Sequence, residues 1–352
     1  MLKQVRTERS PTRLANMGVI RAQGADAVKF LQGQVSNDVA RLAADRAVLA
    51  GLHNAQGRVI ALLRMVLAGP EEVLAILPRE LAAAVAARLS KFVLRAKVKI
   101  SDASAEWDVA GVEVSDAAEG LAQASVGAAR RDEEGRLWVC VATEGGSGAA
   151  VGGSARASAS RWLVASRAAA HPTEPRRAEE DAALHVGSPG PSMTPDEWHA
   201  ANLAAGLPQV YAVTSEAFVA QMLNLDLVDG IAFDKGCYTG QEVIARAHYR
   251  GRVKRRMQRF RTSAPAKLSA GDAGTLSDGR SFKIVDSVEL HDGRTEFLAV
   301  TTFDGTGTTG AAGTGTTGGS GAGPGDDPSD IPASGIPPLD AEQLPLPYAL
   351  PA

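Results

Sequence analysis

The chain has 352 residues, of which 45% are hydrophobic and 22% are charged, and its formal net charge is −3. That length allows a sizeable core and two or three domains, and the small negative charge gives no global case for nucleic-acid binding, so a basic site must be local. Having only two cysteines, Cys140 and Cys237, excludes a disulfide scaffold and favours a reducing compartment, and no apolar run is long enough to span a membrane.

The N-terminal stretch MLKQVRTERSPTRLANM is basic but lacks the apolar core of a secretory signal. A weak transit peptide is one interpretation of it. We expect instead that residues 1–12 are a disordered end of a cytoplasmic protein.

The first hundred residues mix strands and helices. Strands are predicted for GVIRAQG, RVIALLRMVLAG and EEVLAILP, and the last two are joined by a turn at Gly69-Pro70. Helices are predicted for DAVKFLQGQV and for PRELAAAVAARLSKFVL, which begins at Pro78.

A second α+β stretch holds predicted strands in AEWDVAGVEV, RLWVCVAT and SRWLVAS. Cys140 lies within one of these strands and is predicted to belong to the core. The composition near 144–154 and 168–194 turns to Gly, Ala, Ser and Pro, which is typical of mobile insertions. A helix follows in TPDEWHAANLAAGLP, where Thr194 and Glu197 form a capping box and Pro195 takes the first helical position.

The C-terminal region contains short strand-like segments, KRRMQRF, SFKIVDSVEL and TEFLAVTTF, with Asp-Gly turns between them. This pattern predicts a small antiparallel β-barrel formed by 251–303 together with about 340–350. Residues 304–338 are of low complexity and are predicted to be a disordered loop, because the final segment regains Leu and Tyr and can dock on the body.

The segment DKGCYTGQE, residues 234–242, carries the candidate site. Thr239 and Glu242 match a capping box, which predicts a helix that starts at Thr239, with Cys237 two residues before it. The positive end of that helix and the nearby Lys235 would both favour a thiolate. The alternative is that Cys237 fills a small apolar gap. One cysteine cannot bind a metal alone, so a metal at Cys237 would need ligands from a partner chain.

KGCYTGQEVIAR and YRGRVKRR resemble the signature of the YgfZ family, which is related to the glycine-cleavage T-protein, an aminomethyltransferase. Further segments fit the same family in order, namely GADAVKFLQGQVSNDV, HNAQGRVIALL, EWHAANLAAGLPQV, FVAQMLNLDLVDGIAF and LPLPYAL. The resemblance implies an α+β, T-protein-like body at 13–250, in two sub-halves, that binds tetrahydrofolate. It also implies a role in iron–sulfur cluster assembly or repair, and thereby in tRNA modification.

The resemblance also assigns site residues. Cys237 corresponds to the signature cysteine, and Lys235 and Glu242 are its expected supports. Trp198 corresponds to a tryptophan associated with folate, with a half-buried core residue as the alternative, and Met17 stands where a second such tryptophan is found. We also assign Tyr238, Gln241 and Arg246 to the folate-binding group.

The chain departs from the T-protein where that enzyme carries acidic residues. Ala61, Leu62 and Ala204 occupy those positions, and none of these side chains can transfer a proton. We therefore expect a helper protein rather than an enzyme, and a folate-dependent aminomethyltransferase-like enzyme stays open as the alternative.

Seven basic residues lie between Arg250 and Arg261. Three interpretations stay open for them: a solvated strand, a site for the glutamate tail of folate, and an RNA contact, which lacks interleaved aromatic residues. We expect a monomer whose partners are a folate derivative and cluster carrier or client proteins, and a shared iron–sulfur cluster is a further candidate cofactor. We expect no membrane contact and no direct nucleic-acid binding.

Overall fold

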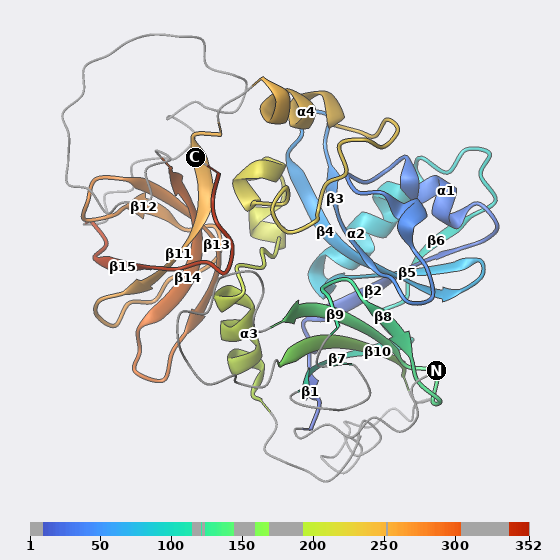
Figure 1. Ribbon diagram of the computed structural model, residues 1–352, viewed down its shortest axis with the longest axis horizontal. Coiled ribbons are helices and arrows are strands. Elements are labelled where there is room, and N and C mark those ends of the chain that lie inside the picture. The colour runs from blue at the N-terminus through green and yellow to red at the C-terminus, as the bar shows by residue number, and fades with distance from the viewer. Residues whose placement is uncertain are drawn as a thin grey trace. The chain divides into compact units, whose positions relative to one another are not determined.

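The computed structural model describes residues 10–114, 121, 124–143, 159–168, 193–250, 253–303 and 338–351 (Figure 1). Most of the segments predicted to be disordered or mobile, at 1–12, 144–154, 168–194 and 304–338, lie outside these residues. The helices are α1 (Ala27–Gln32), α2 (Arg79–Ser90), α3 (Pro195–Ala204) and α4 (Gln241–Tyr249), with 3-10 turns η1 (Val39–Arg41), η3 (Ala212–Thr214) and η4 (Ala220–Leu223).

The chain divides into two compact units. The first consists of Met1–Leu52, Ala61–Trp198 and Gly230–Tyr238. The second consists of His53–Ile60, His199–Asp229 and Thr239–Ala352. The segment Gly230–Tyr238 therefore belongs to the first unit, although the chain on both sides of it belongs to the second.

One sheet of the first unit has the strand order β3-β4-β5-β2-β6. Its strands are β2 (Met17–Gln23), β3 (Val48–His53), β4 (Val59–Gly69), β5 (Glu72–Pro78) and β6 (Lys99–Asp102). Helix α2 packs on β2 and β6 through the side chains of Leu81, Ala82, Val85, Ala86 and Leu89. These positions recur at three and four residues, which is the spacing of one helical face.

The second sheet of this unit has the order β1-β7-β10-β9-β8, and the neighbouring strands are antiparallel. Its strands are β1 (Thr12–Arg13), β7 (Trp107–Val114), β8 (Ala129–Arg131), β9 (Leu137–Thr143) and β10 (Ser160–Arg167). Trp138 and Trp162 are fully buried on it and meet edge to face at 6.5 Å. Cys140 packs in the same cluster, which confirms its prediction as a core residue.

The sheet of the second unit has the order β12-β13-β14-β11-β15. Its strands are β11 (Arg255–Thr262), β12 (Ala273–Thr275), β13 (Ser281–Glu289), β14 (Thr295–Thr302) and β15 (Ala341–Leu344). Phe260, Phe282 and Phe297 form the centre of its core. The antiparallel strands are as predicted, but the predicted closed barrel is not formed. Within the described residues, the two edges of the sheet are linked by no more than an isolated bridge between Leu276 and Leu339.

The strands and helices predicted from the sequence are largely confirmed, and the start of α3 agrees in detail. The Thr194 backbone N–H donates to the Glu197 carboxylate at 2.7 Å, and the Glu197 N–H donates to Thr194 Oγ1 at 3.1 Å. This reciprocal pair is the predicted capping box. Gly206 follows the helix with φ of +62°, a conformation that glycine adopts without steric cost.

Candidate functional site

The two cysteines lie in opposite environments. Cys140 is buried in β9, and burial raises the pKa of its thiol to about 11. Cys237 is exposed. Since a thiol must reach its target to react, only Cys237 is placed to meet a ligand or a partner.

The segment that carries Cys237 is attached to the first unit by Lys235. The Lys235 Nζ donates three hydrogen bonds to backbone carbonyls: 2.6 Å to Gln32 O, 2.7 Å to Val35 O and 2.9 Å to Asn37 O. An ammonium group has three N–H donors, so these bonds use its full capacity. We call Lys235 and its three carbonyl partners the lysine clamp.

Burial lowers the pKa of Lys235 to about 8, and the charge of Asp38 acts in the opposite direction. The Nζ also lies 5.1 Å from the ring centroid of Tyr238, a cation–π distance. Tyr238 is itself buried, which raises the pKa of its hydroxyl to about 12. The lysine thus ties the segment around Cys237 to the backbone of residues 32–37.

Ser36 fixes the other end of the segment. Its Oγ donates to Gly230 O at 2.7 Å and accepts from the Gly51 N–H at 2.8 Å. The Ser36 carbonyl also accepts from the Ala232 N–H at 3.0 Å. Since Ser36 is fully buried, the segment is held at Gly230 and Ala232 as well as at Lys235.

The predicted start of α4 is wrong. The helix begins at Gln241, and Gly240 precedes it with φ of +84° and no side-chain cap, so Thr239 and Glu242 do not form a capping box. A Cβ atom on residue 240 would lie 2.5 Å from Asn54 O and 2.9 Å from Gly57 Cα. The close approach of this backbone and the left-handed turn both require glycine, and they move the helix start beyond Thr239.

The predicted residues on α4 differ in exposure. Glu242 and Arg246 are exposed, and Gln241 is half-buried. Ile244 is the buried residue of the helix, and its carbonyl accepts from Gln221 Nε2 at 2.7 Å. These residues belong to the second unit, whereas Lys235, Cys237 and Tyr238 belong to the first.

Trp198 is buried, with 4% of its surface exposed. It packs against Gly111, where a Cβ atom would lie 2.5 Å from the indole ring, and the Arg161 guanidinium lies 5.6 Å from the ring centroid. Met17 is half-buried at the start of β2, where it pairs with Pro78. A contact of Trp198 or Met17 with folate stays a prediction.

The three positions that lack the acidic residues of the T-protein lie on two elements. Ala61 and Leu62 are buried in β4, and Ala204 is the last residue of α3. The apolar burial of Ala61 and Leu62 leaves β4 without a proton-transfer group at these positions.

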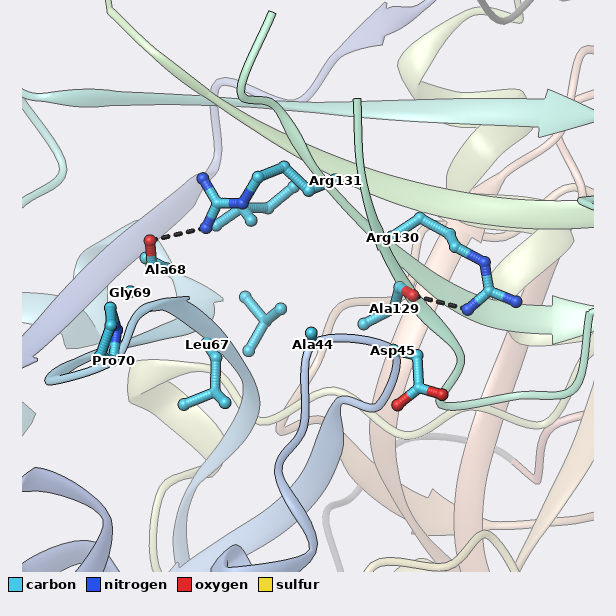
Figure 2. A pocket seen from close by; sticks show the side chains of 11 residues that line it. Ala44, Asp45, Leu67, Ala68, Gly69, Pro70, Ala129, Arg130 and Arg131 are labelled. Carbon is cyan, nitrogen blue, oxygen red and sulfur yellow. Dashed lines mark hydrogen bonds between the residues drawn. The ribbon is translucent and has the colours of Figure 1, made fainter. Parts of the chain in front are cut away.

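A hollow of about 830 Å³ opens in the first unit, between the β4–β5 turn, the Ala44–Asp45 loop and β8 (Figure 2). Its lining is mostly apolar, with Arg130 and Arg131 at its edge; Arg131 Nη2 donates to Ala68 O at 2.6 Å. None of the residues predicted to bind folate is among its described lining residues.

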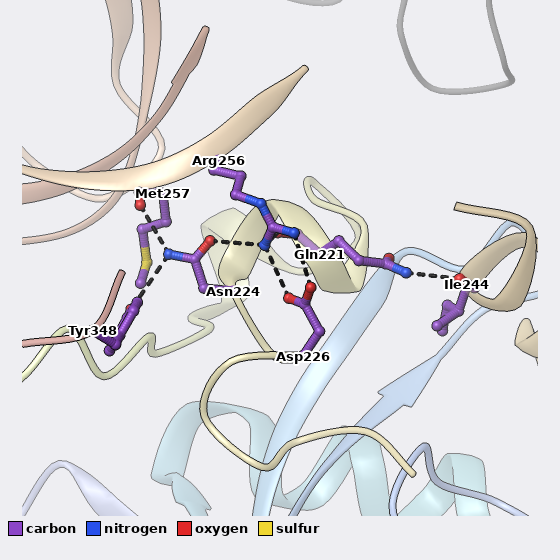
Figure 3. Close-up of polar contacts among 7 residues, drawn as sticks. All are labelled: Gln221, Asn224, Asp226, Ile244, Arg256, Met257 and Tyr348. Carbon is purple, nitrogen blue, oxygen red and sulfur yellow. Dashed lines mark hydrogen bonds and ion pairs between the residues drawn. The ribbon is translucent and has the colours of Figure 1, made fainter. Parts of the chain in front are cut away.

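The sequence interpretation missed a buried polar network in the second unit (Figure 3). Arg256 pairs with Asp226 through two bonds of 3.0 and 2.9 Å, and its Nη1 also donates to Gln221 O at 3.2 Å. Asn224, in a left-handed turn with φ of +57°, donates to Met257 O at 2.9 Å and to Tyr348 Oη at 3.3 Å. The Tyr348 hydroxyl donates to Gly206 O, so the final segment docks within this unit.

This network corrects the view of the arginine run as a solvated strand. Arg256 is buried, and Arg259 and Arg261 both pair with the Glu296 carboxylate, at 2.7 and 3.2 Å. The signal in the sequence was the alternation of Arg256, Gln258 and Phe260 with their neighbours. The acidic partners of the arginines could not be found from it, because they lie at least thirty residues away in the chain. Arg252 lies outside the described residues.

Within the described ranges, no group of three or more His, Cys, Asp or Glu side chains is close enough to hold a metal ion. None of the helices described is both long and apolar enough to cross a membrane.

Comparison with solved structures assigns the fold. The chain superposes on the glycine cleavage system aminomethyltransferase T from Bartonella henselae with a TM-score of 0.61, over 85% of this chain and 80% of that one, at 13% identity. The protein therefore has the α+β fold of the glycine-cleavage T-protein.

Comparison with curated proteins gives the closer relationship. The chain is 28% identical to the tRNA-modifying protein YgfZ of Sodalis glossinidius over 301 residues, and 29% identical to that of Yersinia pestis over 297 residues. Each alignment covers 83% of this chain and 84% of the relative. No protein-family profile matches the chain. The resemblance to the YgfZ proteins is thereby confirmed, and it extends over most of the chain.

Proposed function

We propose that this chain is a YgfZ-type helper protein that binds a folate and supports the assembly or repair of iron–sulfur clusters, and through them tRNA-modifying enzymes. The observation that carries the proposal is the exposed Cys237 on a segment fixed by the lysine clamp. The homology to proteins named for tRNA modification supports the same role.

In this proposal Cys237 supplies a thiolate ligand to a cluster that approaches from solvent on a carrier or client protein. Lys235 fixes the backbone on which the cysteine stands, and its charge adds positive potential to the segment. Because one thiolate cannot complete a cluster site, the remaining ligands come from the carrier or client protein.

The test is anaerobic purification of the protein with and without an iron–sulfur cluster carrier, followed by iron quantification and visible absorption. We expect carrier-dependent iron in wild type, its loss in Cys237→Ser, and its retention in the matched control Cys140→Ser. Equal iron in wild type and Cys237→Ser would contradict the role of this thiol.

The folate part of the proposal is supported by the T-protein fold. It is not supported by a solvent-exposed aromatic ring at Trp198. The Arg161 guanidinium and Gly111 lie against Trp198, so a pterin could stack on that indole only if Arg161 moved. Met17 and Tyr238, which belong to the same unit as Trp198, complete the proposed folate-binding group.

Titration with tetrahydrofolate, followed by tryptophan fluorescence, tests this part. We expect a saturable change in wild type that is reduced in Trp198→Phe and kept in Trp138→Phe. Trp138 is a suitable control because it is buried in the core cluster around Cys140. An equal response in both variants would exclude Trp198, and no saturable response in wild type would exclude folate.

The second candidate is an aminomethyltransferase-like enzyme, which the T-protein fold favours. The residues at Ala61 and Leu62 argue against it, because neither can act as an acid or a base. Release of ammonia from an aminomethyl-lipoyl carrier in the presence of tetrahydrofolate would establish the enzyme; its absence, together with carrier-dependent iron, would establish the helper.

A further inference from the structure

The loop between α2 and β6 in the first unit combines features that neither the fold nor the cysteine segment explains (Figure 1). Its sequence from Lys91 to Lys99 is KFVLRAKVK, and its four cations are all exposed. No acidic residue occurs between Leu81 and Ser101. A strongly basic segment in a chain of net charge −3 is a local electrostatic feature.

Several arginines of the described chain pair with carboxylates, and the cations of this loop do not. Among the described residues, Arg256, Arg280 and Arg294 each pair with a carboxylate. The side chains of the loop cations form no ion pair within the described part of the chain; these residues are Lys91, Arg95, Lys97 and Lys99. Their charge is therefore available to an external anion.

Two large apolar side chains stand among these cations. Phe92 is 50% exposed and Leu94 is 87% exposed. A large apolar residue that is almost fully exposed beside another one is a common mark of a binding surface. We call residues 91–99 the basic-aromatic loop.

The basic-aromatic loop is held in place by the backbone beneath it. The Asp26 N–H donates to Lys97 O at 3.2 Å, and the Lys97 N–H donates to Asp26 Oδ2 at 2.6 Å. Gly24, with φ of +138°, brings its Cα so close that a Cβ atom would lie 2.2 Å from Lys97 O. The loop is thus fixed while its cations and apolar side chains face solvent.

Contrary to the expectation from the sequence, we propose that the basic-aromatic loop binds single-stranded RNA. Unpaired cations neutralise phosphates, and an exposed aromatic ring stacks on a base of any sequence. Phe92 between Lys91 and Arg95 supplies the aromatic residue that the arginine run lacks, and Leu94 provides apolar contact to a base or a ribose. This surface is separate from the arginine run, where Arg256, Arg259 and Arg261 are used in ion pairs.

An acidic protein is the competing occupant of such a surface. RNA is favoured because the loop carries four exposed cations and an exposed aromatic ring within nine residues, which suits a chain of repeated phosphates and bases. The inference does not depend on the folate or cluster role, because it uses no residue of the cysteine segment.

The test is fluorescence anisotropy of a labelled single-stranded RNA of about 20 nucleotides, long enough for one binding site, over a salt range of about 50–200 mM. We expect saturable binding that weakens with salt. The double variant Lys91→Gln/Arg95→Gln should lower affinity by about tenfold and reduce the slope of log K against log salt by about 1.4. Phe92→Ala should lower affinity by about tenfold with the slope unchanged, because stacking releases no counterions.

The matched control is Arg250→Gln/Lys267→Gln, which removes two exposed cations elsewhere and should leave binding unchanged. Equal weakening in the control would assign RNA to general charge or to the arginine run and would overturn the proposal. The same follows if wild type shows no binding, or if poly-L-glutamate of matched charge binds more tightly than the RNA. Cys237→Ser should bind RNA as wild type does, which separates this result from the cluster experiment.

Discussion

Each unit contains a cation that holds a backbone segment in place: the half-buried Lys235 in the first unit and the buried Arg256 in the second. Their charges are stabilised by different partners. Lys235, in the first unit, directs its ammonium at three backbone carbonyls. Arg256, in the second unit, meets the Asp226 carboxylate through two parallel bonds and reaches Gln221 and Asn224 as well. Backbone carbonyls can accept hydrogen bonds from a charged or from a neutral amine, so they do not require Lys235 to stay protonated. The Asp226 carboxylate, in contrast, is stable at its site only beside the charged guanidinium of Arg256.

This difference affects how the backbone segments beside the two cations respond to pH. Lysine can lose its proton near neutral pH when it is buried, but an arginine guanidinium stays protonated in proteins. The attachment of the Cys237 segment can therefore respond to pH, while the network around Arg256 cannot. The following predictions test this contrast, from the largest expected effect to the smallest.

Arg256→Met should cost the most, about 3–5 kcal/mol of the free energy of unfolding, because it leaves the Asp226 carboxylate, only 11% exposed, without its partner. Chemical denaturation of the second unit measures it. The double variant Arg256→Met/Asp226→Leu should recover much of the loss, since no charge is then left alone. A loss below about 1 kcal/mol in the single variant would show that the pair is solvated and not buried.

Lys235→Met should cost about 2 kcal/mol, because three carbonyls lose their donor while the half-exposed site lets water replace part of it. Amide hydrogen exchange over Gly230–Tyr238 should become faster in the same variant. Lys29→Met, at an exposed lysine of α1, is the control and should change neither quantity. Unchanged exchange in Lys235→Met would contradict the lysine clamp.

The pH dependence of stability should distinguish the two cations. Lys235 has its pKa lowered to about 8, below the ordinary value of 10.5. Between these two pH values the unfolded chain binds more protons at this residue, so the free energy of unfolding rises with pH. After allowance for partial solvent screening, we expect wild type to gain about 1 kcal/mol over Lys235→Met across this range.

Denaturation of wild type, Lys235→Met and Arg256→Met at several pH values gives this comparison directly. The difference between wild type and Arg256→Met should stay constant through the same range. A parallel slope in the wild-type and Lys235→Met curves would mean that Lys235 keeps its ordinary pKa.

The smallest expected effect is the coupling of Lys235 to the ring of Tyr238, about 0.5–1 kcal/mol at a distance of 5.1 Å. A double-mutant cycle with Lys235→Met and Tyr238→Leu isolates it from the packing of the tyrosine. Repeating the cycle with Tyr238→Phe, which keeps the ring, should give almost no coupling. A coupling that persists with phenylalanine would place the interaction at the hydroxyl.

One sequence pattern gave opposite outcomes at two places. Thr194 and Glu197 form the capping box that their spacing predicts, and the same spacing at Thr239 and Glu242 does not. At the second place Gly240 turns left-handed under the backbone of Asn54 and Gly57. A local motif is therefore a sufficient guide only where no distant segment of the chain imposes a different backbone conformation.

The sequence by itself determined the strands and helices with strong periodicity, the buried Cys140 and the resemblance to YgfZ. These features depend on residues close together in the chain, whose propensities and spacing act locally. Only the tertiary structure decided that Lys235 binds carbonyls about two hundred residues away, that Arg256 is buried against Asp226, and that α4 begins after Gly240. Such pairings depend on which distant segments meet, and burial then decides which charges need a partner.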